Sequence, residues 1–316
     1  MNTPLLLLLF NRPKETNFLF DKLKQIKPKK IYINQDGPRN KKDIDLCNQV
    51  RKIFHKRDWD CEIFENIKTK NLGCRNSVSE GINWFFQNEE KGIILEDDCL
   101  PSKSFFTFSE KMLKKYEYDN NIFLISGSNF QKNRIIGDGD YYFSKYAHCW
   151  GWSTWKRAWI KYDKNLNFWE TWKKSKNWKN FHRNNFEKRY WPKIFNKVKD
   201  NKIDSWAYVW LASVWFNNGV TITPNCNLIQ NIGFNVNATS TISSNKTYNI
   251  AKEEKMNSVI KDPANKSIDI QADELVFKNH FNGIYNFWPW RLIYIIKILI
   301  KDPRTFWLKF IKNLKC

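Results

Sequence analysis

Apolar runs alternate with amphipathic segments along the first hundred residues of the chain. The predicted strands are residues 4–10, 30–34, 61–64 and 92–95, and the predicted helices are residues 14–26, 42–56 and 74–87. Uninterrupted apolar runs indicate buried strands, whereas apolar residues at a spacing of three and four indicate helices packed on them. Their regular alternation is typical of an α/β fold built on a doubly wound parallel sheet.

The pattern continues less regularly in the second half. We expect strands at 122–127 and 220–224, and helices at 102–116, within 155–200 and at 206–216. The stretch from 155 to 200 is dense in tryptophan and lysine. Most of the 16 Trp and 24 Phe of the chain are expected to pack in the core, and a carbohydrate-contacting surface is the alternative use of some of them.

Three acids, Glu96, Asp97 and Asp98, directly follow the apolar run that ends at Leu95. Carboxylates at the end of a buried strand need water, cations or a metal, because an unpaired buried charge is costly. Ligands of open α/β sheets bind at this carboxyl edge. The acids therefore predict a Mn²⁺ or Mg²⁺ site, and a solvated strand end is the alternative interpretation.

Arg12 and Asp36 also follow predicted strands, so right-handed crossovers would bring them to the same edge as the acids. The alternative is that they are turn residues that pair with each other. Asp204 precedes the apolar helix at 206–216 and is either a functional acid or the N-cap of that helix. The chain has neither a Gly-x-Gly-x-x-Gly nor a Gly-Lys-Ser/Thr segment, which disfavours dinucleotide dehydrogenases and P-loop enzymes.

The composition of the chain limits which binding partners and metal sites are expected. A net charge of +21 attracts polyanions such as nucleic acid, anionic lipid or phosphorylated substrates. Lysine is spread over the whole chain beside abundant asparagine, so this charge is not taken as evidence for nucleic acid. Seven cysteines without a Cys-x-x-Cys pair and four histidines without ligand spacing disfavour a zinc site or a disulfide framework, and indicate a reducing cytoplasm.

The two ends of the chain carry further apolar runs. The N-terminal run lacks a basic segment before it, is cut short by Asn11-Arg12-Pro13 and is expected to be the first buried strand. The run at 286–301 contains Trp288, Trp290 and basic residues. It predicts an amphipathic helix lying on an anionic membrane surface, and a C-terminal helix docked in the core is the alternative.

Several ordered segments give the chain a family resemblance. They are Asn11-Arg12-Pro13, Gln35-Asp36, Arg75 upstream of Gly81-Ile82-Asn83-Trp84, Glu96-Asp97-Asp98 before Pro101-Ser102-x-x-Phe105-Phe106, Cys149-Trp150-Gly151-Trp152, Asp204-Ser205-Trp206, and Pro224-x-x-Asn227 leading to Asn231-Ile232-Gly233. Over about residues 3–241 this order resembles N-acetylglucosaminyltransferase I and its bacterial relatives. The resemblance implies a GT-A glycosyltransferase fold, with a Rossmann-like mixed sheet flanked by helices.

The resemblance also implies roles for individual residues. Arg12, Asp36 and Arg75 would contact the nucleotide, Asp98 would be the direct Mn²⁺ ligand, and Asp204 would be the catalytic base. Glu96 and Asp97 would lie against the sugar, the ribose or metal-bound water. One departure is the run 237–241, which has no His where bacterial relatives often carry one, so the resemblance gives no support for a metal or phosphate contact from this loop.

We therefore predict a glycosyltransferase domain at 1–245 and a basic C-terminal extension at 246–316. It would transfer a sugar from a nucleotide diphosphate donor, of which UDP-sugars are the favoured class, to a glycan or lipid-linked glycan acceptor. The resemblance implies inversion, and a bacterial surface polysaccharide or lipopolysaccharide pathway at the cytoplasmic membrane fits the composition. The alternatives are a sugar-phosphate nucleotidyltransferase, whose usual Gly-rich basic loop after the first strand is missing here, and a non-catalytic protein that binds membranes or polyanions.

Overall fold

The computed structural model describes residues 1–132, 134–233, 256 and 259–301. Its N-terminal half contains β1 (Leu5–Leu9), α1 (Pro13–Ile26), β2 (Lys30–Gln35), α2 (Lys41–Phe54), β3 (Glu62–Ile67), α3 (Gly73–Asn88), β4 (Lys91–Glu96), β5 (Cys99–Pro101), α4 (Lys103–Lys115) and β6 (Ile122–Ser126). The predicted elements of this half are confirmed, with boundaries that differ by at most three residues.

The second half contains β7 (Tyr141–Ser144), β8 (Trp152–Trp155), α5 (Lys156–Trp159), α6 (Trp169–Trp172), α7 (Lys176–Phe181), α8 (Asn185–Lys199), α9 (Trp206–Phe216), β9 (Val220–Pro224), β10 (Ile229–Asn231), α10 (Ile270–Asn279), a 3-10 turn η1 (Ile284–Asn286) and α11 (Trp290–Lys301). The stretch 155–200 is thus a set of short helices followed by α8. None of the described helices has the length and apolarity needed to cross a bilayer.

Eight strands form one mixed sheet in the order β3-β2-β1-β4-β8-β6-β9-β7, and β10 pairs with β5 in a small second sheet. Strands β1 to β4 are parallel, as the alternation predicts. The parallel arrangement does not extend over the whole sheet, because β8 and β7 run antiparallel to their neighbours. The α/β class, with a mixed sheet flanked by helices, is confirmed.

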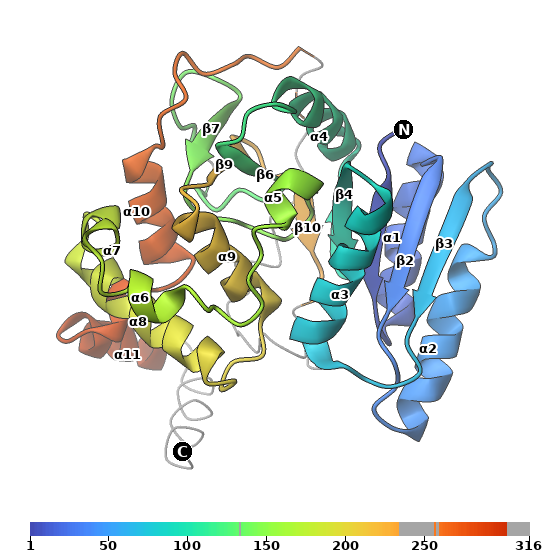
Figure 1. Cartoon of the computed structure of the whole chain (residues 1–316), viewed down its shortest axis with the longest axis horizontal. Helices are drawn as coiled ribbons and strands as arrows, with labels where there is room; N and C mark the ends of the chain where they lie inside the picture. The colour runs from blue at the N-terminus through green and yellow to red at the C-terminus, as the bar shows by residue number, and fades with distance from the viewer. Residues whose placement is uncertain (133, 234–255, 257–258, 302–316) are drawn as a thin grey trace.

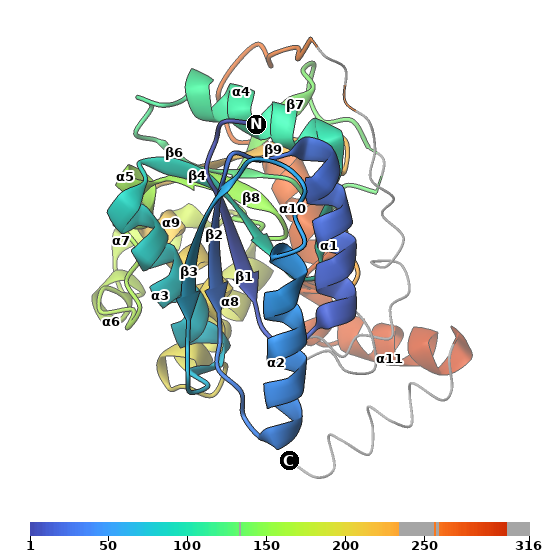
Figure 2. The same cartoon turned by 90° about the vertical axis from the view of Figure 1, so that its right-hand side faces the viewer.

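Helices cover both faces of the sheet (Figures 1 and 2). Side chains of successive strand residues point to opposite faces, so Leu5, Leu7 and Leu9 pack with α1, α2 and α4, whereas Leu6 and Leu8 pack with α3 and α9. β1 is therefore fully apolar because both of its faces are buried.

Core packing accounts for most of the tryptophans. The fully buried or nearly buried ones are Trp152, Trp155, Trp159, Trp169, Trp172, Trp178, Trp191, Trp206, Trp210 and Trp215. All but Trp155 belong to one aromatic core between the sheet, α8 and α9. The prediction that core packing is the main use of these residues is confirmed.

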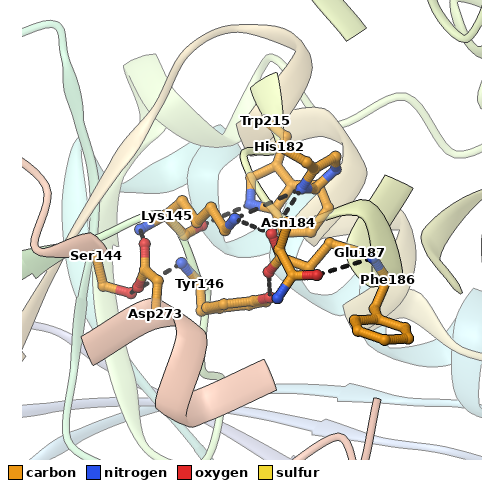
Figure 3. Close-up of polar contacts among 9 residues, drawn as sticks. All are labelled: Ser144, Lys145, Tyr146, His182, Asn184, Phe186, Glu187, Trp215 and Asp273. Carbon is orange, nitrogen blue, oxygen red and sulfur yellow. Dashed lines mark hydrogen bonds and ion pairs between the residues drawn. The ribbon is translucent and has the colours of Figure 1, made fainter. Parts of the chain in front are cut away.

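A buried polar network fastens α8 and α10 to the segment that follows β7 (Figure 3). Glu187 of α8 accepts hydrogen bonds from Lys145 and Tyr146, and Asp273 of α10 accepts from Ser144 and from the backbone N–H of Lys145. The residues before α10 extend the edge of the sheet, since Ile268 bridges to Phe143. The predicted domain boundary near residue 245 lies outside the described residues.

Candidate functional site

The acids at the end of β4 meet Arg12, which lies just beyond β1. Leu8 of β1 is in register with Glu96, so the two strand ends are adjacent. Nη1 of Arg12 lies 3.2 Å from Oδ1 of Asp97 and 2.7 Å from Oδ2 of Asp98. The predicted convergence of these three residues on one sheet edge is therefore what the structure shows.

Negative charge is in excess at this edge. Burial raises the pKa of Glu96, and the neighbouring carboxylates Asp98 and Asp97 raise it further. Burial likewise raises the pKa of Asp97, although the Arg12 guanidinium opposes the shift. These three carboxyl groups, of which Asp97 is buried and Glu96 and Asp98 are half-buried, repel one another, and a bound cation would relieve that repulsion.

The donor set of this edge fits a hard divalent cation by its chemistry, because it consists of carboxylate oxygens. Within the described part of the chain, no three His, Cys, Asp or Glu side chains are arranged so that they could hold a metal ion by themselves. Mg²⁺ sites in phosphate-processing proteins commonly use one or two carboxylates and complete their shell with water and substrate phosphates. Asp98 as a single direct ligand is compatible with that pattern.

Residues 231–233, which come from the second half of the chain, pack against Asp98. β10 pairs antiparallel with β5, and the N–H of Ile232 donates to the backbone carbonyl of Asp98 at 2.9 Å. A Cβ at Gly233 would overlap the Asp98 carboxylate, so any other residue at this position would have to displace that side chain. The run 237–241, for which the resemblance gives no support for a metal or phosphate contact, lies outside the described residues.

Asp36 follows β2 and is buried by the segment that leads into α3. Its Oδ1 accepts the N–H groups of Gly37 at 2.8 Å and Leu72 at 2.9 Å, and its Oδ2 accepts from Nδ2 of Asn71 at 2.9 Å. Burial raises its pKa, and the N–H donors of Leu72 and Gly37 oppose that shift. Asp36 therefore ties the end of β2 to the start of α3, and its contact with a nucleotide stays a prediction.

Asp204 is exposed and lies against the first turn of α3. Its Oδ1 accepts the backbone N–H of Arg75 at 3.2 Å. It is not the N-cap of α9, because Ser205 fills that position by accepting from the N–H of Tyr208. Gly73, at φ +80°, leaves room beside the Asp204 carboxylate.

The guanidinium of Arg75 is buried and directed toward the C-terminal end of α8 and the segment at Lys164. Nη1 donates to the carbonyl of Val198 at 3.1 Å and to Oδ1 of Asn201 at 3.0 Å, while Nη2 donates to the carbonyl of Lys164. These bonds fasten the end of α8, and the segment running from it to Asp204, onto α3. The predicted nucleotide contact of Arg75 stays a prediction.

Cys74 is a residue of this region that the sequence did not single out. It is exposed at the first turn of α3. The pKa of its thiol is raised to about 12, first by desolvation and then by the negative charges of Glu96, Asp204 and Asp36. Cys74 is thus subject to the negative charge of Glu96 and Asp204, and no spacing pattern in the sequence marks it.

A cavity of about 520 Å³ lies at the other end of the sheet, beside β7. It is lined by residues 136–143 and 263–271 together with Arg183, and by none of the predicted site residues. The acidic edge and this cavity are separate features.

No protein-family model matches the chain, and no curated protein matches it in sequence. Solved structures with a similar arrangement include an active-site mutant of LgtC (9% identity, 86% of this chain and 94% of that chain, TM-score 0.36). UDP-glucose pyrophosphorylase complexed with UDP-glucose is 8% identical over 71% of this chain and 91% of that one, with a TM-score of 0.35.

A third similar structure is 4-diphosphocytidyl-2C-methyl-D-erythritol synthase from Anaerococcus prevotii, with 12% identity, coverage of 68% and 97%, and a TM-score of 0.33. Such identities and TM-scores are too low to assign an activity. The resemblance to N-acetylglucosaminyltransferase I has no support at the level of a family and stays a prediction.

Proposed function

We propose that the chain is a metal-dependent glycosyltransferase that moves a sugar from a nucleotide diphosphate donor, with UDP-sugars the favoured class, to a hydroxyl of a glycan acceptor. The observation that carries the proposal is the gathering of two kinds of carboxylate around the first turn of α3. Glu96, Asp97 and Asp98 form a half-buried group of three carboxyl groups with one guanidinium, that of Arg12, whereas Asp204 is exposed and accepts the backbone N–H of Arg75.

The half-buried group of Arg12 and the three acids suits a diphosphate that arrives with a divalent cation. Asp98 would hold Mn²⁺ or Mg²⁺, with Glu96 and Asp97 beside it, and the ion would supply charge neutralisation for the diphosphate leaving group. Arg12, already within 2.7 Å of Asp98, would add a guanidinium to the same negative group. Asp36 and Arg75 remain the predicted nucleotide contacts from the strand β2 and helix α3 sides.

Asp204 would act as the general base. The proton of the acceptor hydroxyl passes to its carboxylate while the acceptor oxygen bonds to the anomeric carbon and the carbon–diphosphate bond breaks. The Arg75 N–H fixes Oδ1 and thereby orients the carboxylate. Attack from the face opposite the diphosphate inverts the anomeric configuration.

The proposed setting is bacterial surface polysaccharide or lipopolysaccharide synthesis at the inner face of the cytoplasmic membrane. A glycan carried on a membrane lipid would be the acceptor. The high positive charge of the chain supports this placement, because the cytoplasmic leaflet is anionic.

The test is a donor screen that measures nucleoside diphosphate release by the full chain with and without Mn²⁺. We expect release from one UDP-sugar, dependent on the metal, and a loss of roughly 10²-fold or more for Asp98→Asn. Asp58→Asn is the matched control, since Asp58 pairs with Lys24 on the exposed surface. Full turnover by Asp98→Asn would refute the assignment of the metal ligand.

Two further results would replace the proposal with an alternative. Release of pyrophosphate from a nucleoside triphosphate and a sugar phosphate would identify a nucleotidyltransferase. Binding of anionic polymers that survives Asp98→Asn, without turnover of any donor, would identify a non-catalytic binder.

A further inference from the structure

The segment after η1 exposes a row of apolar side chains. Trp288 is 81% exposed and Leu292 is 53% exposed, and Ile296 and Ile300 are exposed as well. Leu292, Ile296 and Ile300 are spaced by four residues and therefore lie on one side of α11. A helix docked in the core would bury such a row. These four side chains are exposed, so they do not fit the alternative of a C-terminal helix docked in the core.

Helix α8 carries a stripe of basic residues next to this segment. Arg189, Lys193 and Lys197 are exposed and also spaced by four residues. None of the three forms an ion pair within the residues that the structure describes. We call these three residues the α8 basic stripe.

The ring of Phe287 connects the stripe with the apolar row. The guanidinium of Arg189 lies 5.4 Å from the centre of this ring, and the ammonium of Lys193 lies 5.2 Å from it. Phe287 is buried and immediately precedes Trp288, so the apolar row starts directly beside the stripe. Figure 2 shows α11 projecting away from the body of the molecule.

We propose that the α8 basic stripe and the exposed row of Trp288, Leu292, Ile296 and Ile300 form one surface that docks on an anionic lipid bilayer. An exposed apolar row containing tryptophan inserts into the interface between headgroups and acyl chains. A neighbouring row of unpaired cations is attracted by anionic headgroups. The proposal deepens the membrane location given above and rests on it, but it requires neither a particular donor nor a particular acceptor.

Binding of the full chain to vesicles tests the surface without any substrate. Vesicles of phosphatidylcholine and phosphatidylglycerol in a three-to-one ratio are compared with vesicles of phosphatidylcholine alone, by sedimentation. We expect binding to the anionic vesicles, weakened by salt. Each cation near such a surface contributes roughly a five-fold factor, so changing all three stripe residues to Gln should weaken binding roughly 10²-fold.

Two variants accompany the stripe variant. Trp288→Ser with Leu292→Ser should reduce binding to the anionic vesicles while the stripe is intact. Lys41, Lys42 and Lys52 of α2 changed to Gln remove the same charge from exposed positions at the opposite end of the molecule (Figure 1) and should leave binding within about two-fold of the parent. Melting curves establish that all three variants fold.

The outcomes separate the proposals. Equal loss of binding in the stripe variant and the α2 variant would overturn the docking surface, as would failure of the parent chain to bind anionic vesicles. A concentration-dependent dimer that Trp288→Ser dissociates would show that a second copy covers the row instead. Nucleoside diphosphate release from the donor, measured with a soluble acceptor and without vesicles, reports on the transferase separately.

Discussion

Glu187 is expected to be one of the most sensitive positions for stability. It is 2% exposed, and its Oε2 lies 2.7 Å from Nζ of Lys145 and 3.1 Å from Nδ1 of His182. The hydroxyl of Tyr146 donates to the other carboxylate oxygen (Figure 3). Replacing Glu187 with Gln keeps the shape of the side chain but removes the charge that pairs with the Lys145 ammonium, whose side chain is 12% exposed.

The magnitude follows from the proton affinity of the carboxylate. Burial opposes ionisation of Glu187, but the hydrogen bond with His182 and the charge of Lys145 outweigh it and lower its pKa from 4.5 to about 2. That difference corresponds to about 3 kcal/mol in favour of the ionised form in the folded protein. Breaking a buried ion pair by removing one partner costs about 3–5 kcal/mol, in agreement with this value.

We therefore expect Glu187→Gln to lower the free energy of unfolding at pH 7 by about 3 kcal/mol, measured by urea denaturation. In the parent chain, this contribution is complete above pH 4.5 and is lost as the pH falls toward 2, since the folded-state pKa lies below the unfolded one. The variant should lack that acid-dependent loss.

Glu170→Gln serves as the control. Glu170 forms an exposed pair with Lys173, so this substitution should cause no measurable change in the free energy of unfolding. A change of less than about 1 kcal/mol for Glu187→Gln would contradict the reasoning. Replacing Lys145 and Glu187 together by Met should restore much of the loss, because no uncompensated charge remains.

Three further predictions concern the site and the pH dependence. Gly233→Ala pushes the Asp98 carboxylate aside, so metal-dependent nucleoside diphosphate release should fall roughly 10²-fold in kcat, and parent-like kcat would contradict the close packing. Arg75→Met removes the bonds that fasten the segment before Asp204, so steady-state kinetics should show a lower kcat at an unchanged donor KM; a raised KM would instead support the predicted nucleotide contact. Burial raises the pKa of Asp273 to about 7, so the folded protein keeps a proton that the unfolded chain loses above about pH 4. The melting temperature should therefore fall as the pH rises from about 4 to 7, and Asp273→Asn should flatten that dependence.

The N-terminal half was predictable because its signals are local. β1, β2 and β4 each contain a short apolar run, and each helix between the strands shows its own periodic apolar face. The site residues Arg12, Asp36 and Asp98 follow these strands directly, so their common edge could be inferred from the handedness of the crossovers alone. The contact between Arg12 and Asp98 is the result of that topology.

The parts that could not be predicted depend on pairs of residues far apart in the chain. β8 enters between β4 and β6 although Trp152–Trp155 is only four residues long and lies in an aromatic stretch without a strand period. The direction of the Arg75 guanidinium depends on carbonyl groups at Lys164 and Val198, which no residue type near Arg75 reveals. A single sequence carries no signal for such backbone acceptors.

The first turn of α3 joins the two halves of the candidate site. Asp36, from the end of β2, accepts the N–H of Leu72, while Asp204, which precedes α9, accepts the N–H of Arg75. Leu72 offers no side-chain oxygen to the free N–H groups at this helix end, so carboxylates from two other elements take the place of an N-cap. The favourable position of negative charge at a helix N-terminus thus holds both acids near Cys74. Because the same helix end anchors an acid from each half of the chain, the relative placement of the proposed nucleotide contact and the proposed base depends on the residues 72–75.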